Sequence, residues 1–246
     1  MTELAYMVRE DWAQHGTAME HQSAIIRNWI GGPPYLFAVT DVTKFNQDDR
    51  GADVEAAVFV APSRADRKVF NIRELKSLER GTNLVDHAIV VLHPFEQREL
   101  ETIRQTVEAN SVGKLFILIR SRYEMVRTWL DGLGAMNLHT GEGAPATDPL
   151  LLAAAEMIHN EDYNGLDSGR GKDAVVQLVR AFVAEGYSDE PEAWLRAYFA
   201  VGGSFHHAES IEKLTKEIKA GTRHRVKTRY RDDIVNIIRE QLAAQR

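Results

Sequence analysis

Four short and almost continuously apolar runs recur through the first half of the chain: residues 35–40 (YLFAVT), 55–61 (EAAVFVA), 87–92 (HAIVVL) and 114–119 (KLFILI). None of them alternates between apolar and polar positions. Continuous apolar runs of this length are typical of strands buried on both faces, as in a parallel sheet. The pattern therefore predicts four buried strands.

Helical spacing of apolar residues separates these runs. It predicts helices over residues 71–80, 95–110 and 123–133, and a first helix over residues 5–30 that ends at the Gly-Gly-Pro-Pro of residues 31–34. Strands that alternate with helices at this spacing favour a mostly parallel sheet with helices on both faces.

The pattern changes near residue 137. Residues 139–149 (HTGEGAPATDP) have the composition of a linker, and only helical patterns follow, over residues 150–159, 173–185, 191–201, 204–220 and 231–244. The expected architecture is a Rossmann-like α/β domain over residues 1–138, a linker over 139–149 and a helical domain over 150–246.

Composition narrows the possible chemistry. The 246 residues include no cysteine, which excludes disulfide scaffolds, cysteine zinc sites and thiol catalysis. No apolar run reaches the roughly 20 residues of a membrane helix, and the acidic N-terminus is unlike a signal peptide. We therefore expect a soluble cytoplasmic protein with no membrane partner.

The net charge of −6 conceals an asymmetry between the two ends of the chain. Residues 1–200 contain 30 acidic and 20 basic side chains, whereas residues 201–246 contain 6 acidic and 10 basic ones. An acidic body and a basic end are therefore separable, and the basic end is where an anionic partner is expected.

Polar side chains follow each predicted strand, at the edge where open parallel sheets bind ligands. The candidates are Asp41, Ser63, His93, Arg120 and Arg122. We expect Asp41 to act as a base or to hold a metal such as Mg²⁺, and His93 to relay protons. Arg120 and Arg122, with the Ser63 hydroxyl, would bind phosphate or carboxylate.

Residues 160–173 (NEDYNGLDSGRGKD) form an unusual glycine-rich loop. The twelfth position of an EF-hand is occupied by Gly171, and Gly171-Lys172 lacks the following Ser or Thr of a P-loop, so neither motif is complete. Backbone N–H groups near Gly169 and Gly171, together with Lys172, could bind an anion at the start of a helix. The alternative is a tight turn between two helices.

The region from residue 213 to residue 231 is strongly basic, and its part TRHRVKTRYR alternates cations with other residues. If this part is extended, one side could follow a phosphate backbone while Tyr230 stacks on a base. The candidate nucleic-acid residues are Arg223, Arg225, Lys227, Arg229 and Tyr230. The alternative is a basic face packed against the acidic body.

The leading hypothesis is a protein that binds a nucleotide or another phosphate-bearing ligand at the carboxyl ends of the strands, with hydrolysis as an open possibility. The second hypothesis is a nucleic-acid-binding or regulatory module that uses residues 213–231, and the third is a protein–protein adaptor. The sequence leaves open whether the protein is an enzyme and what its oligomeric state is.

Overall fold

The computed structural model describes residues 1–13, 19–31, 35–47, 68–81 and 84–244. It contains two compact units, unit 1 (Met1–Ala144) and unit 2 (Pro145–Arg246). Their boundary falls within the segment expected to be a linker. Each unit has its own core and is considered by itself.

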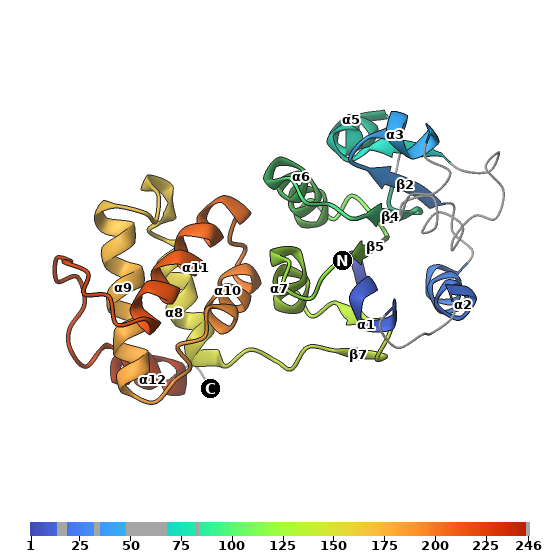
Figure 1. The fold of residues 1–246 in the computed structure, drawn as a ribbon. Coiled ribbons are helices and arrows are strands. Elements are labelled where there is room, and N and C mark those ends of the chain that lie inside the picture. Colours follow the sequence, from blue (N-terminus) through green and yellow to red (C-terminus); the bar gives the residue numbers. More distant parts are fainter. Residues whose placement is uncertain (14–18, 32–34, 48–67, 82–83, 245–246) are drawn as a thin grey trace. The chain divides into compact units, whose positions relative to one another are not determined.

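Unit 1 is built on one sheet (Figure 1). Its strands are β1 (Glu3–Val8), β2 (Tyr35–Val39), β3 (Val69–Asn71), β4 (Ala88–Leu92), β5 (Lys114–Ile119), β6 (Met136–Asn137) and β7 (Glu142–Gly143). They lie in the order β3-β2-β4-β5-β1-β6-β7. Every neighbouring pair is parallel except β6 and β7, so the predicted Rossmann-like α/β class is confirmed.

The helices of unit 1 are α1 (Arg9–Ala13), α2 (Met19–Ile30), α3 (Val42–Gln47), the 3-10 turn η2 (Ile72–Glu74) with α5 (Leu75–Gly81), α6 (Gln97–Glu108) and α7 (Met125–Gly132). In Figure 1, α6 and α7 lie on one side of the sheet and α2 lies on the other. On the α2 side, Ile26 and Ile30 pack with inward residues of the central strands, including Phe37 and Phe116. The strands are therefore buried on both faces, as their apolar composition requires.

Three expectations about the elements of unit 1 need correction or lie outside the described residues. The helix expected over residues 5–30 is wrong at its start, because Glu3–Val8 forms β1 between β5 and β6. The strand β7, which pairs antiparallel with β6, lies within residues 139–149, where only a linker was expected. The strand expected over residues 55–61 lies outside the described residues.

The connections reverse direction between β2 and β4. The chain leaves β2 toward the outer strand β3, whereas it leaves the neighbouring strand β4 in the opposite direction, toward β5. Connections that diverge in this way leave a crevice at the carboxyl ends of the two strands, which is where open α/β sheets bind ligands. The β2–β4 edge is therefore the part of unit 1 where a site is expected.

Unit 2 consists of helices α8 (Pro149–His159), η3 (Asp162–Asn164), α9 (Gly169–Ala184), α10 (Pro191–Ala200), α11 (Phe205–Lys219) and α12 (Ile234–Ala244). Its core contains Trp194, Phe182, Phe199 and Phe205. These bounds confirm the helical C-terminal region, although α9 begins four residues before its predicted start. No helix in the described ranges is long and apolar enough to cross a membrane.

Candidate functional site

Three polar residues follow neighbouring strands at the β2–β4–β5 edge of unit 1: Thr40 after β2, His93 after β4 and Arg120 after β5. The strands are in register there, with Ala38 opposite Val91 and Leu92 opposite Leu118. The sheet therefore brings together the predicted pair His93 and Arg120 at one edge, beside the reversal of the connections.

His93 has the most unusual environment of the three. It is 2 % exposed, and its N–H donates to the carbonyl of Leu118 over 2.9 Å, one step beyond the end of β4. Its φ of 47° lies in the left-handed region, which costs a residue with a side chain of this size about 1–2 kcal/mol. Such strain persists where surrounding structure enforces it, and it concentrates at functional sites.

Burial, together with the positive charges of Arg120 and Arg9, lowers the pKa of His93 to about 3. The two guanidiniums therefore lie near the ring, one after β5 and one after β1. The imidazole is neutral at physiological pH, so the positive charge at this edge comes from arginine and not from histidine.

Glu99 was not among the residues expected from the sequence. Its side chain on α6 is completely buried, and the Thr40 hydroxyl donates to Glu99 Oε2 over 3.1 Å. Since Thr40 follows β2 and α6 follows β4, this bond spans the two diverging connections. Burial raises the pKa of Glu99. The sequence gives one indication of this burial: Glu99 lies one turn before Ile103, on the apolar face of the helix.

The two arginines of the Arg120-Ser121-Arg122 sequence have different environments. Arg122 pairs with Asp11 over 2.9 Å and lies 4.0 Å from Glu10, so acids already offset its charge. Arg120 is exposed, and its guanidinium forms no hydrogen bond or ion pair with any residue the structure describes. Of these two predicted anion ligands, only Arg120 is available to a ligand without first breaking an ion pair.

The side chain of Asp41 caps a helix. Its Oδ1 accepts hydrogen bonds from the backbone N–H groups of Thr43 at 2.9 Å and Lys44 at 3.1 Å, which caps the N-terminus of α3. Within the described ranges, no three His, Asp or Glu side chains gather as they would to hold a metal. The geometry therefore favours capping over the expected base or metal role. Ser63 lies outside the described residues.

The glycine loop of unit 2 is a close-packed turn. A Cβ on Gly171 would lie 2.1 Å from the carbonyl oxygen of Gly165, so α9 approaches the preceding turn more closely than any side chain permits. Gly165 and Gly169 have φ values of 85° and 56°, in the region that favours glycine. These contacts account for the glycines and favour the turn over the expected anion site, whereas Lys172 contributes to a basic surface described below.

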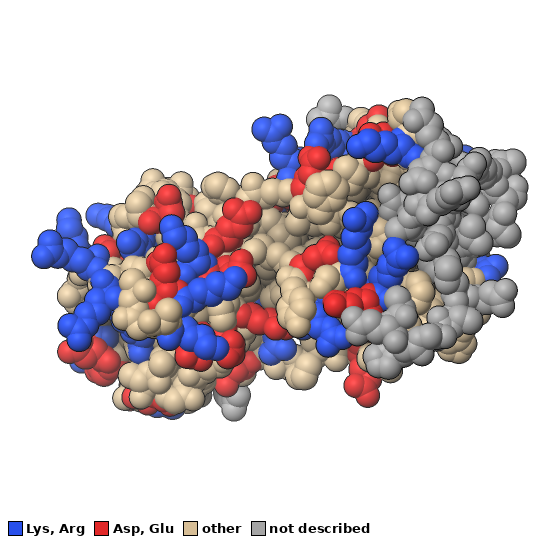
Figure 2. Space-filling view, viewed as in Figure 1, with Lys and Arg blue, Asp and Glu red and all other residues tan. Residues whose placement is uncertain are grey.

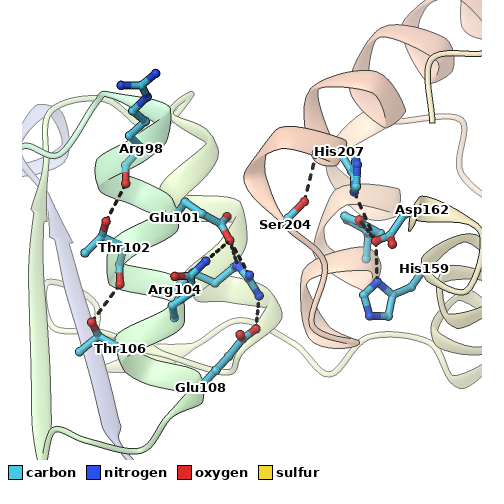
Figure 3. A network of polar contacts seen from close by, with 12 residues as sticks. Arg98, Glu101, Thr102, Arg104, Thr106, Glu108, His159, Asp162, Ser204 and His207 are labelled. Carbon is cyan, nitrogen blue, oxygen red and sulfur yellow. Dashed lines mark hydrogen bonds and ion pairs between the residues drawn. The ribbon is translucent and has the colours of Figure 1, made fainter. Parts of the chain in front are cut away.

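A polar cluster in unit 2 was also missed (Figure 3). Asp162 Oδ2 lies 2.8 Å from His159 Nδ1 and 3.4 Å from His207 Nδ1, and the Tyr198 hydroxyl donates to it over 2.8 Å. One carboxylate thus joins α8, α10 and α11. No sequence motif spans these residues, because the helix packing alone brings them together.

The basic end of the chain forms neither a helix nor a strand over residues 222–229. Arg223, Arg225 and Lys227 are exposed, whereas His224 and Val226 between them are half-buried. The side chains of the three cations make no hydrogen bond or ion pair with the described part of the chain. The predicted alternation of sides therefore describes this segment.

The other two candidate residues of the basic end, Arg229 and Tyr230, are less accessible. Arg229 pairs with Glu161, and it is half-buried. Tyr230 is also half-buried, and burial raises the pKa of its hydroxyl. Of the five residues expected to contact nucleic acid, three present unpaired cations and one presents part of an aromatic ring.

The chain matches no protein-family model, no curated protein and no solved structure. Its function is therefore argued from its own residues. Two surfaces present exposed cations: the carboxyl edge of the sheet in unit 1 and the basic segment over residues 222–229 in unit 2.

Proposed function

We propose that unit 1 binds a phosphate-bearing ligand, such as a nucleotide, at the carboxyl edge of its sheet beside the β2–β4 reversal. The observation that carries this proposal is the guanidinium of Arg120, which forms no ion pair with a described residue and lies near the strained and buried His93. A guanidinium binds phosphate through two parallel hydrogen bonds, which fix orientation as well as adding affinity.

Two exposed aromatic residues favour a ligand that also carries a base. Phe95 follows β4 and is 66 % exposed, and Tyr123 follows β5 and is 86 % exposed. Both precede helices on the same side of the sheet, α6 and α7, and so belong to the edge that holds Arg120. Their ring faces are available for stacking on a nucleobase.

The geometry supports binding more than it supports general-base catalysis by His93. A general base works best with a pKa near the operating pH, and the pKa of His93 at about 3 makes it a poor proton acceptor near neutrality. A neutral imidazole can still donate or accept one hydrogen bond with a ligand.

Thermal unfolding in the presence of ligands tests this proposal. Pyrophosphate and a panel of nucleotides, with and without Mg²⁺, should raise the Tm by mass action, and Arg120→Gln should abolish the rise. Lys76→Gln, which removes an exposed cation from α5, should preserve it. A panel that leaves the Tm unchanged, or an Arg120→Gln protein that responds fully, would refute the proposal.

A second candidate function, polyanion binding, belongs to unit 2. The specific observation in its favour is the row of exposed cations at Arg223, Arg225 and Lys227, which form no ion pair in the part of the chain that the structure describes. Salt-dependent retention on heparin would support it. The adaptor hypothesis and the cytoplasmic location remain predictions from the sequence.

A further inference from the structure

We propose that unit 2 binds a single-stranded nucleic acid, with consecutive phosphates along Arg223, Arg225 and Lys227 and a base at the cleft beside Tyr230. This inference rests on polyanion binding by unit 2 and goes further, because it names the form of the polymer and the residue that contacts its base.

The spacing of the three cations suits a row of phosphates. In an extended chain, alternate residues are about 7 Å apart and project to the same side. That repeat is close to the separation of successive phosphates along an extended nucleic-acid strand. The exposed cations alternate with the half-buried His224 and Val226 along this basic strip (residues 222–229), so the strip can offer one cation for each phosphate.

The strip is held in place by α9 before any ligand binds. Arg180 on α9 donates to the carbonyls of Thr222 and His224 over 3.2 and 3.4 Å. About one turn earlier on α9, Gln177 donates to the carbonyl of Lys227 and accepts from the N–H of Arg229 over 2.9 Å. A segment whose backbone is already held by side chains of α9 loses little conformational entropy when a strand docks along it.

Cations of the neighbouring helices add to the positive electrostatic field around the strip. Burial lowers the pKa of His224, and the charges of Lys172, Arg180 and Lys213 lower it further while Glu217 opposes them. Three cations from α9 and α11 therefore lie near the inner side of the strip. Figure 2 shows blue side chains gathered at the margin of unit 2 where α9 and the segment after α11 lie in Figure 1. Such a field raises the local concentration of anions.

The surface at the end of the strip favours a single strand over a duplex. A cleft of about 280 Å³ opens at the end of the strip and is lined by Gln177, Arg180, Ala181, Tyr230, Arg231, Asp232 and Ile234. Its lining includes the half-buried ring of Tyr230, on which a single base can stack. Bases are free to stack on an aromatic ring only when they are unpaired.

Fluorescence anisotropy of the full-length protein with labelled 12-nucleotide oligo-U and oligo-dT tests the strip. The combined variant Arg223→Gln, Arg225→Gln and Lys227→Gln should weaken binding and reduce the slope of log K against log salt by about 2, since each phosphate contact on a single strand contributes about 0.7. The matched control removes three cations elsewhere, through Lys76→Gln, Arg98→Gln and Arg239→Gln, and should change the slope much less.

A second pair of variants tests the base contact. Tyr230→Leu should weaken oligonucleotide binding by about 10-fold, since a stacked base contributes roughly that factor or more. Tyr230→Phe should retain the wild-type affinity because it keeps the ring. Circular dichroism of both variants checks that the helices of unit 2 are intact.

The outcomes separate the inference from the function on which it rests. If neither heparin, a 12-base-pair duplex nor the oligonucleotides bind, polyanion binding by unit 2 is refuted and the inference falls with it. If heparin and the duplex bind as tightly as the single strands and Tyr230→Leu has no effect, polyanion binding stands and the single-strand inference is overturned. Preferential single-strand binding that depends on both the strip and Tyr230 supports the inference.

Discussion

Acidification should destabilise unit 1 through His93 well above the pH at which the imidazole titrates in the folded protein. The pKa of His93 is about 3 when folded and 6.5 in its ordinary state, so between these values the unfolded chain binds a proton that the folded chain does not. Stability must therefore fall as the pH decreases below 6.5. Above 6.5 both states are neutral at this position and the contribution vanishes.

The magnitude follows from the same two values. At pH 5 the difference in proton binding costs about 2 kcal/mol relative to pH 7.5, at 1.36 kcal/mol for each pKa unit. The side chain is 2 % exposed, so solvent screening does little to reduce this cost. Asparagine is the replacement of choice because it tolerates the left-handed conformation that His93 adopts.

Urea unfolding of the wild type and His93→Asn at pH 7.5 and pH 5, followed by tryptophan fluorescence, measures this effect. The wild type should lose about 2 kcal/mol more than the variant between the two pH values. Glu99 acts in the opposite direction, since its raised pKa favours the folded state at lower pH, but it does so in both proteins and cancels in the comparison. Parallel losses in the two proteins would refute a buried neutral imidazole.

Two further predictions concern unit 2 and use urea unfolding as the readout. Gly171→Ala should lower the free energy of unfolding by about 3 kcal/mol, because the new Cβ would lie 2.1 Å from a backbone oxygen. Gly169→Ala should lower it by only about 1 kcal/mol, because the new Cβ has open space and the φ of 56° is the only source of strain. Equal losses in the two variants would contradict the close approach at Gly171. Tyr198→Phe should cost about 2 kcal/mol because it removes a buried hydrogen bond to the Asp162 carboxylate, and a loss no larger than that of the control Tyr187→Phe would argue against this bond.

The parallel core was predictable from the sequence because strands buried on both faces must be apolar throughout. The residues of β2, β4 and β5 show this signal without interruption. The strand Glu3–Val8 is equally buried over its last four residues, but it consists of residues that also suit helices and runs directly into α1. Its strand conformation is decided by the hydrogen bonds of its neighbours β5 and β6, which local propensity does not record.

The site was less predictable because it depends on which side chains meet. The sequence identified His93 and Arg120 from their place after strands, and that place holds them at one edge. It could not distinguish Arg120 from Arg122, since the acids that pair with Arg122 lie more than a hundred residues earlier in the chain. It offered Asp41 as a base or metal ligand without indicating that its carboxylate caps a helix.

The charge of the chain becomes informative only when each cation is considered with its partner. Many basic side chains are offset by an acid, as Arg104 is by Glu101 and Glu108, and a ligand anion would have to compete with those carboxylates. Four cations on the two proposed surfaces form no ion pair within the described residues: Arg120, Arg223, Arg225 and Lys227. A net charge of −6 therefore does not prevent anion binding, because a phosphate at close range responds to the unpaired cations beside it more than to distant charges screened over about 10 Å.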